Sequence, residues 1–80
     1  MEAYILFNSS SQKIGMMTYH LGKFASQLST NILIPIRDAN VVKQSHLKSI
    51  TKDNMTRDEL DAILLHCQSI PNTRLTRQTW

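Results

Sequence analysis

The chain has 80 residues, of which 41% are hydrophobic, and it carries a formal net charge of +3. This length allows a single domain with a small core, and the apolar fraction is too high for an intrinsically disordered chain. Because dimerisation would enlarge so small a core, we include a homodimer among the expected states.

The sequence contains neither a disulfide framework nor a membrane-spanning run. Its single cysteine, Cys67, cannot form an intramolecular disulfide, and the N-terminal residues lack the basic and apolar regions of a signal peptide. The apolar runs AYILF and ILIPI fall far short of the roughly 20 residues that a membrane-spanning helix needs. We therefore expect a cytoplasmic protein with no membrane contact.

Charge is distributed unevenly along the chain. Residues 1–50 carry a net charge of +3, residues 51–70 carry −2, and residues 71–80 carry +2. A basic body, an acidic segment and a basic tail are compatible with nucleic-acid binding, although a charge of this size also serves solubility.

The first two expected elements are a strand at residues 3–7 and a helix at residues 17–29. The strand is apolar throughout, which is typical of a strand covered on both faces. In the helix, apolar residues recur at steps of three and four, as in an amphipathic helix; they are Met17, Leu21, Phe24, Ala25 and Leu28.

The serine-rich segment 9–15 lies between that strand and that helix. A loop in this position can bind an anion, because free backbone amides and the helix dipole favour negative charge. A phosphate-binding P-loop, however, has fixed glycines and a lysine directly after the last one, whereas Met16 follows Gly15 here. We therefore interpret the segment as a turn.

A second strand is expected at residues 31–36, at a sheet edge or ending at Pro35, because proline cannot donate to a strand ladder. Residues 38–51 are predicted as a helix, with a short strand near Val41–Val42 as the alternative; the helical spacing is that of Ala39, Val42, His46 and Ile50. As a helix, this segment would place a basic helix before an acidic one, as in a variant helix-turn-helix.

The best-defined element is a helix at residues 56–69. Thr56 and Glu59 have the spacing of a capping box, in which each side chain accepts a hydrogen bond from the other residue's backbone amide. Met55 and Leu60 flank this cap at the positions of a hydrophobic staple. Pro71 cannot continue the helix, so the helix must end shortly before it.

Taken in order, these elements predict an α+β fold in one small domain. Residues 1–71 form a strand, a helix, a strand and two further helices, with the short third strand near Val41–Val42 as the alternative. If the first two strands are parallel neighbours, the helices cover one face of the sheet. Residues 72–80 form a basic C-terminal tail, which we expect to be mobile unless Leu75 and Trp80 pack.

Three stretches resemble parts of known families. YILFNSSSQKIGMMTYHLGKFASQLSTNILIPIRD resembles the first strand, loop, helix and strand of deviant Walker ATPases, and KFASQLSTNILI with LKSI resembles phosphocarrier proteins of the sugar phosphotransferase system. ILIPIRDANVVKQSHLKSI resembles the last strand and helix of small RNA-cleaving toxins from bacterial toxin–antitoxin pairs. Each resemblance covers less than half of the chain.

Each of these stretches also lacks the residue that carries the family's chemistry. Met16 and Met17 stand where the ATPases have lysine and threonine, and Met17 stands where the phosphocarriers have histidine. The toxins have a Gly-Ser-His run, whereas His20 follows a tyrosine. The sequence is therefore assigned to no family.

The residues that could bind a metal or perform catalysis form no motif. His20, His46, His66 and Cys67 include no pair at ligand spacing, so no metal or cofactor is expected. The candidates for acid–base chemistry, His20, His46, Asp38 and Tyr19, are far apart in the chain, so no catalytic residue can be assigned. The chain is more readily interpreted as a non-enzyme.

Our main functional prediction is a small non-catalytic regulatory protein that binds nucleic acid through a basic patch and a basic aromatic tail. Its expected binding residues are Lys43, Lys48, Arg74, Arg77 and Trp80, with Lys13 and Lys23 extending the patch. One alternative is a protein-binding regulator or inhibitor that docks on a larger partner through the acidic helix or the tail. A second alternative, suggested by the toxin resemblance, is a minimal RNA-cleaving enzyme with His20 or His46 as the base.

Overall fold

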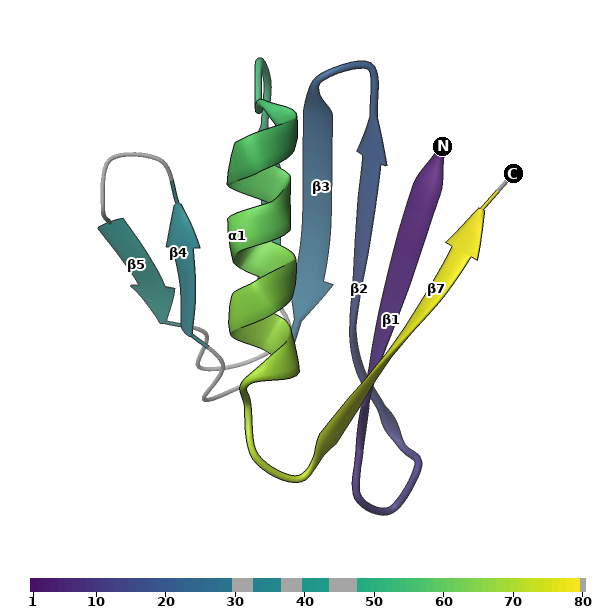
Figure 1. Ribbon diagram of the computed structural model, residues 1–80. Coiled ribbons are helices and arrows are strands. Elements are labelled where there is room, and N and C mark those ends of the chain that lie inside the picture. The colour runs from purple at the N-terminus through teal and green to yellow at the C-terminus, as the bar shows by residue number, and fades with distance from the viewer. Residues whose placement is uncertain (30–32, 37–39, 44–47, 80) are drawn as a thin grey trace.

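A computed structural model describes residues 1–29, 33–36, 40–43 and 48–79 of the chain (Figure 1). The described elements are seven strands and one helix: β1 (Glu2–Asn8), β2 (Lys13–His20), β3 (Lys23–Leu28), β4 (Leu33–Ile36), β5 (Asn40–Lys43), β6 (Lys48–Lys52), α1 (Arg57–Gln68) and β7 (Thr73–Thr79). Five strands form one antiparallel sheet in the order β6-β3-β2-β1-β7, and β4 and β5 form a separate antiparallel pair. The fold is therefore α+β with a single described helix.

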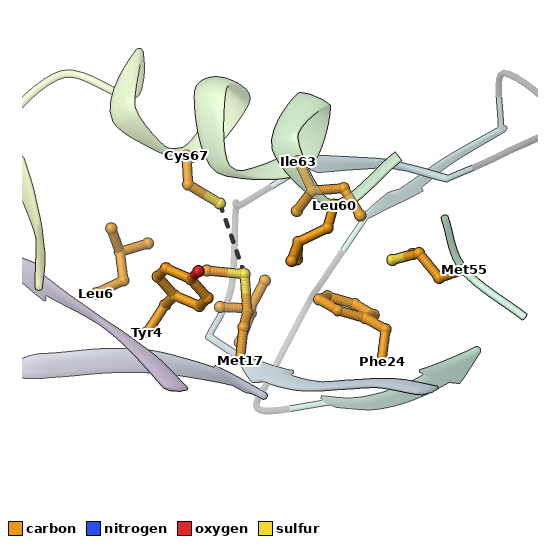
Figure 2. Close-up of a cluster of buried hydrophobic side chains, with 9 residues drawn as sticks. Tyr4, Leu6, Met17, Phe24, Met55, Leu60, Ile63 and Cys67 are labelled. Atoms are coloured by element: carbon orange, nitrogen blue, oxygen red, sulfur yellow. Dashed lines mark hydrogen bonds between the residues drawn. The ribbon is translucent and has the colours of Figure 1, made fainter. Parts of the chain in front are cut away.

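The helix α1 lies against one face of the five-stranded sheet. Figure 2 shows side chains of α1 pointing onto side chains from β1, β2 and β3, with the phenyl ring of Phe24 beside Leu60. The buried cluster consists of Tyr4, Leu6, Met17, Phe24, Leu28, Met55, Leu60, Ile63 and Cys67. On its other side α1 contacts β4, and the β4–β5 hairpin stands beside the helix in Figure 1.

The helix predicted at residues 56–69 is confirmed. Thr56 is the N-cap of α1: its side chain accepts a hydrogen bond from the Glu59 amide (3.2 Å), and the Glu59 side chain accepts one from the Thr56 amide (3.0 Å). Met55 and Leu60, the expected staple pair, are both in the buried cluster. The strand predicted at residues 3–7 is also confirmed, as β1.

The predicted order of strand, helix, strand and two further helices is wrong. Residues 17–29, predicted as the first helix, form no helix. They belong to the hairpin of β2 and β3, in which buried and exposed residues alternate with the period of two that a half-buried strand requires. Leu21 and Gly22 form the connection, with φ angles of 51° and 78°, as in a type I′ turn. The glycine that would have weakened a helix is thus the second central residue of a turn.

The helix predicted at residues 38–51 is also wrong. Within this range the structure describes β5 and β6, and the alternative short strand near Val41–Val42 lies in β5. The strand predicted at residues 31–36 appears as β4, in which Pro35 is paired with Val41. Because no described helix precedes α1, the helix-turn-helix interpretation is also wrong. His46 lies outside the described residues.

Residues 73–79 are an integral edge strand of the sheet rather than a separate tail. β7 pairs with β1 along its whole length, from Glu2 opposite Thr79 to Asn8 opposite Thr73. Leu75, which lies opposite Leu6, packs against the buried cluster, so the last strand contributes to the core. Trp80 lies outside the described residues.

The serine-rich segment is a turn, as expected, but it does not lead into a helix. The Asn8 carboxamide oxygen accepts hydrogen bonds from the amides of Ser10 (3.0 Å) and Gln12 (2.9 Å), and Ser11 has a φ of 58°. These contacts close the hairpin between β1 and β2. Since a strand follows the turn, no helix dipole is present there to attract an anion.

Gly15 is needed in β2 because the neighbouring strand approaches it closely. A Cβ atom at this position would lie 2.0 Å from Leu28 Cδ2 and 3.2 Å from the Gln27 carbonyl oxygen. Leu28 is fully buried and paired directly with Gly15, so it cannot move aside without disturbing the core.

We expect Gly15→Ala to lower the free energy of unfolding by about 1–3 kcal/mol, the usual cost of overpacking a core. Urea unfolding followed by circular dichroism measures this change. The double variant Gly15→Ala/Leu28→Val removes the clashing methyl group and should lose less stability than the sum of the two single variants. Strict additivity would show that the two positions are not in contact.

Leu21 occupies a backbone conformation that suits asparagine better than leucine. Its φ of 51° is unfavourable for a bulky side chain, and 85% of the residue is exposed, so packing contributes little in return. We therefore expect Leu21→Asn to raise the free energy of unfolding by about 0.5–1 kcal/mol. Leu21→Val, which is β-branched, should lower it in the same urea titration; equal midpoints for the two variants would contradict the turn assignment.

Candidate nucleic-acid interface

The face of the five-stranded sheet opposite α1 is not covered by any described element, and we call it the open face. Strand alternation places on it the residues that lie between the buried ones. By register these are Ala3, Ile5, Phe7, Lys13, Met16, Thr18, His20, Lys23, Ala25, Gln27, Ser49, Thr51, Arg74, Thr76 and Gln78.

Three neighbouring strands place two cations on either side of an aromatic ring at one end of the open face. Phe7 on β1 is paired with Lys13 on β2 and with Arg74 on β7. The pairing shifts between Leu6 and Phe7, so that Ile14 is an extra residue in β2 and Lys13 comes to lie opposite Phe7. The Arg74 guanidinium carbon lies 4.6 Å from the centre of the Phe7 ring, a cation–π contact.

Most described carboxylates lie away from the open face. Glu2 is on the opposite face of β1, and the helix carries Asp58, Glu59 and Asp61. Asp53 directly follows β6, at the end of the sheet where Lys23 lies. Within the described part of the chain, no carboxylate pairs with Lys13, Lys23 or Arg74. The end of the open face that carries Lys13 and Arg74 therefore has cations and no described carboxylate, while α1 presents negative charge.

The centre of the open face is partly apolar and slightly hollowed. Ile5 and Met16 face each other across β1 and β2. A shallow depression of about 220 Å³ lies over β2, β3 and β6, where Thr18, Gln27 and Thr51 are among the lining residues. A smaller one of about 110 Å³ extends it towards Lys13, and Met16 and Gln27 line both.

The structure separates the binding residues that the sequence suggested. Lys13 and Arg74 lie at one end of the open face, and Lys23 lies at the other end, opposite His20. Arg77 is on the opposite face of β7, where it contacts Glu2. Lys43 ends β5 and Lys48 begins β6; the side chains of these two residues, like Trp80, lie outside the description.

Phe7 is the residue of this face that sequence reasoning missed. The run AYILF was interpreted as covered on both sides, because all of its residues are apolar. In the sheet, Tyr4 and Leu6 are buried under α1, whereas Ile5 and Phe7 are only partly buried on the open face. An antiparallel strand covered by a helix on one face only leaves every second residue on the other face, so an assignment of a single helix would have predicted that Phe7 is exposed.

A second surface feature is a groove of about 490 Å³ between α1 and the edge strand β7. Its apolar lining comes mainly from Leu64 and Leu65 of the helix and from Leu75 of the strand, and Leu65 is 68% exposed. Arg57, Asp61 and Arg77 supply charges, so the groove is mixed in character rather than basic.

Glu2 connects the helix to the two strands beside this groove. Its carboxylate accepts hydrogen bonds from the Tyr4 hydroxyl and the Arg57 guanidinium, and it lies 3.5 Å from an Arg77 terminal nitrogen. Arg57 also pairs with Asp61 at 3.2 Å. The pKa of Glu2 is lowered below its usual value, mainly by the hydrogen bond from Tyr4 and next by that from Arg57. The pKa of Tyr4 is raised, mainly by burial and next by its hydrogen bond to Glu2.

No match was found when the chain was compared with protein-family models, curated proteins and solved structures. Its function must therefore be inferred from the chemistry of its own side chains.

The described residues offer no arrangement typical of a metal site or of acid–base catalysis. They include no group of three His, Cys, Asp or Glu side chains that could hold a metal ion. His20 is exposed at the end of β2 and makes no hydrogen bond or ion pair with a described residue. The Tyr19 hydroxyl donates to the Met55 carbonyl at 2.8 Å, which is a structural contact.

Cys67 is a core residue. Its sulfur lies 3.8 Å from that of Met17, and burial raises the pKa of its thiol to about 11, so it remains a thiol at neutral pH. Of the helices in the described ranges, none has the length and apolar character needed to span a bilayer.

The lowered pKa of Glu2 predicts acid sensitivity. A carboxylate with a lowered pKa in the folded state stabilises the fold above its unfolded pKa, and this contribution is lost as the pH falls through the folded pKa. We expect urea unfolding to show stability decreasing below about pH 4.5 in the wild type, and decreasing less steeply in Glu2→Gln. Tyr4→Phe removes the largest cause of the shift and should lie between them. Identical pH profiles for all three proteins would contradict this role of Glu2.

Proposed function

We propose that the protein is a small non-catalytic regulator that binds nucleic acid on the open face of its sheet. The observation that carries this proposal is the row of Lys13, Phe7 and Arg74 at an end of the open face where no described carboxylate lies. Cations without a carboxylate partner are free to neutralise phosphates, and each such contact releases bound counterions from the nucleic acid.

The acidic character of α1 favours the sheet over the helix as the binding element. Proteins that insert a helix into the major groove need a helix that tolerates the surrounding phosphates. The exposed side of α1 carries Asp58 and Asp61, and its first turn also contains Glu59. These charges would repel the phosphate backbone, so the open face is the surface that fits the ligand.

A second copy of the chain is a poorer fit to this face. At the Lys13–Arg74 end, two open faces stacked on each other would gain no ion pair, because the charged side chains there are cations. A homodimer through this face would have to rest on its neutral residues alone.

The groove between α1 and β7 supports the alternative function, a regulator or inhibitor that binds a larger protein. Leu65 is an exposed apolar residue beside Leu64 and Leu75, and β7 is an edge strand of the five-stranded sheet. Edge strands and apolar grooves are common sites of peptide recognition. This surface is distinct from the open face, so mutations can separate the two functions.

Fluorescence anisotropy tests the main proposal. Wild-type protein should bind a labelled random-sequence single-stranded oligonucleotide at about 50 mM salt. It should lose roughly twentyfold in affinity at about 200 mM, as expected for three phosphate contacts with a combined salt slope of about 2.1. Lys13→Gln/Arg74→Gln should weaken binding on the order of tenfold or more and should reduce the salt slope by about 1.4, because two phosphate contacts are lost.

The matched control is Lys52→Gln, which removes a positive charge from the side of the sheet that faces α1, where Lys52 lies 3.8 Å from Glu59. It should bind almost as tightly as the wild type. The proposal is wrong if the wild-type protein binds neither RNA nor DNA detectably at low salt. It is also wrong if Lys13→Gln/Arg74→Gln binds as tightly as the control. Leu65→Asp, which alters only the groove, should leave nucleic-acid binding unchanged.

A further inference from the structure

The Arg74 side chain is exposed and lies over an aromatic ring. Its guanidinium lies over the Phe7 ring at 4.6 Å, Arg74 is exposed, and no described carboxylate binds it. Where a guanidinium plane lies along a ring, the ring covers one of its faces and the other face can stack on a further planar group. The contact reduces the freedom of a long side chain before any ligand arrives, which lowers the entropy cost of binding.

A planar cation of this kind fits a nucleobase together with its phosphate. Bases of single strands stack on aromatic rings and on Arg guanidinium planes, whereas the base faces in a duplex are covered by their neighbours. The apolar Ile5 lies two residues before Phe7 on the same face, with Met16 opposite it, so a base next to Arg74 would meet a surface that is not fully polar. The depressions lie further across the sheet, over β2, β3 and β6.

The distance between the two basic ends of the open face sets the length of strand that can reach both. Lys13 begins β2, and Lys23 lies opposite His20 at its end. The seven steps from Lys13 to His20 span roughly 23 Å at a strand rise of about 3.3 Å per residue. At about 3.4 Å per nucleotide of a stacked strand, this distance corresponds to roughly seven nucleotides.

We propose that the open face binds single-stranded nucleic acid of about seven nucleotides, with one base stacked on the Arg74 guanidinium and Phe7 acting as the positioning residue beneath it. This inference rests on the proposed function, and it specifies the class of nucleic acid and the residue that contacts a base. Lys13 and Lys23 contact phosphates towards the two ends of the strand.

The experiment compares anisotropy titrations of labelled oligothymidylates of 3, 6, 9 and 12 nucleotides with those of an abasic 9-mer and a blunt duplex. Affinity should rise up to about seven nucleotides and then become nearly constant, and the duplex should bind more weakly than the 9-mer. Arg74→Lys keeps the charge and removes the plane. It should weaken binding of the thymidylate 9-mer about tenfold, leave the salt slope unchanged and have no effect on the abasic 9-mer.

Two further variants make the test specific. Lys13→Arg is the matched control, because it exchanges the same two residue types at a phosphate-contacting position, and it should bind like the wild type. Phe7→Leu removes the ring beneath Arg74 and should reproduce the loss seen with Arg74→Lys, provided that its circular dichroism spectrum is native.

The outcomes separate the inference from the proposed function. The stacking inference is wrong if Arg74→Lys binds the thymidylate 9-mer as tightly as the wild type. It is also wrong if the substitution lowers the affinity for the abasic 9-mer as much as the affinity for the thymidylate 9-mer. In either case, salt-sensitive binding would still support the proposed function. Equal affinity for the duplex overturns the preference for single strands. Absence of binding to every oligonucleotide at low salt overturns the proposed function itself.

Discussion

One helix can bury only one face of a five-stranded sheet, and this constraint shapes the rest of the molecule. Strands lie about 4.8 Å apart, so five of them span roughly 20 Å, whereas a helix with its side chains is about 10–12 Å wide. The buried cluster accordingly joins α1 to β1, β2 and β3. The edge strand β7 is left with a groove beside the helix, and the opposite face of the sheet is left open.

Strand alternation then separates the charges. Residues next to each other in a strand point to opposite faces, so Arg74 lies on the open face while Arg77, three residues later, lies on the helix side. On the helix side Arg77 meets Glu2, which also binds Arg57 of α1. On the open face Arg74 meets the ring of Phe7 and no described carboxylate. Because residues alternate between the two faces, Arg77 is paired with a carboxylate, whereas Arg74 is bound by no described carboxylate.

The acidic helix contributes to this division in two ways. Asp58 and Glu59 in its first turn interact favourably with the helix dipole, and Glu59 also completes the capping box. The same charges make α1 unsuitable as a contact for phosphates. These charges are the reason why the proposed nucleic-acid site is placed on the sheet, and the proposed alternative, a protein partner, in the groove beside α1.

The sequence by itself determined the elements whose signals are local. The capping box and Pro71 define α1 within a few residues, and an apolar run defines β1. Residues 17–29 were misinterpreted because Met17, Phe24 and Leu28 have helical spacing along the chain, although they belong to two paired strands. The turn that separates these strands is Leu21–Gly22, which lacks the Asn or Asp that usually marks a type I′ turn.

Only the tertiary structure decided which residues share a surface. Lys13, Phe7 and Arg74 come together because β1 pairs with β2 on one side and with β7 on the other, and because one extra residue in β2 shifts its register. A change of register by one residue would send Lys13 to the opposite face. Local sequence patterns contain no information on that register between distant segments, because it is set by packing Leu6, Gly15, Leu28 and Leu75 side by side beneath a single helix.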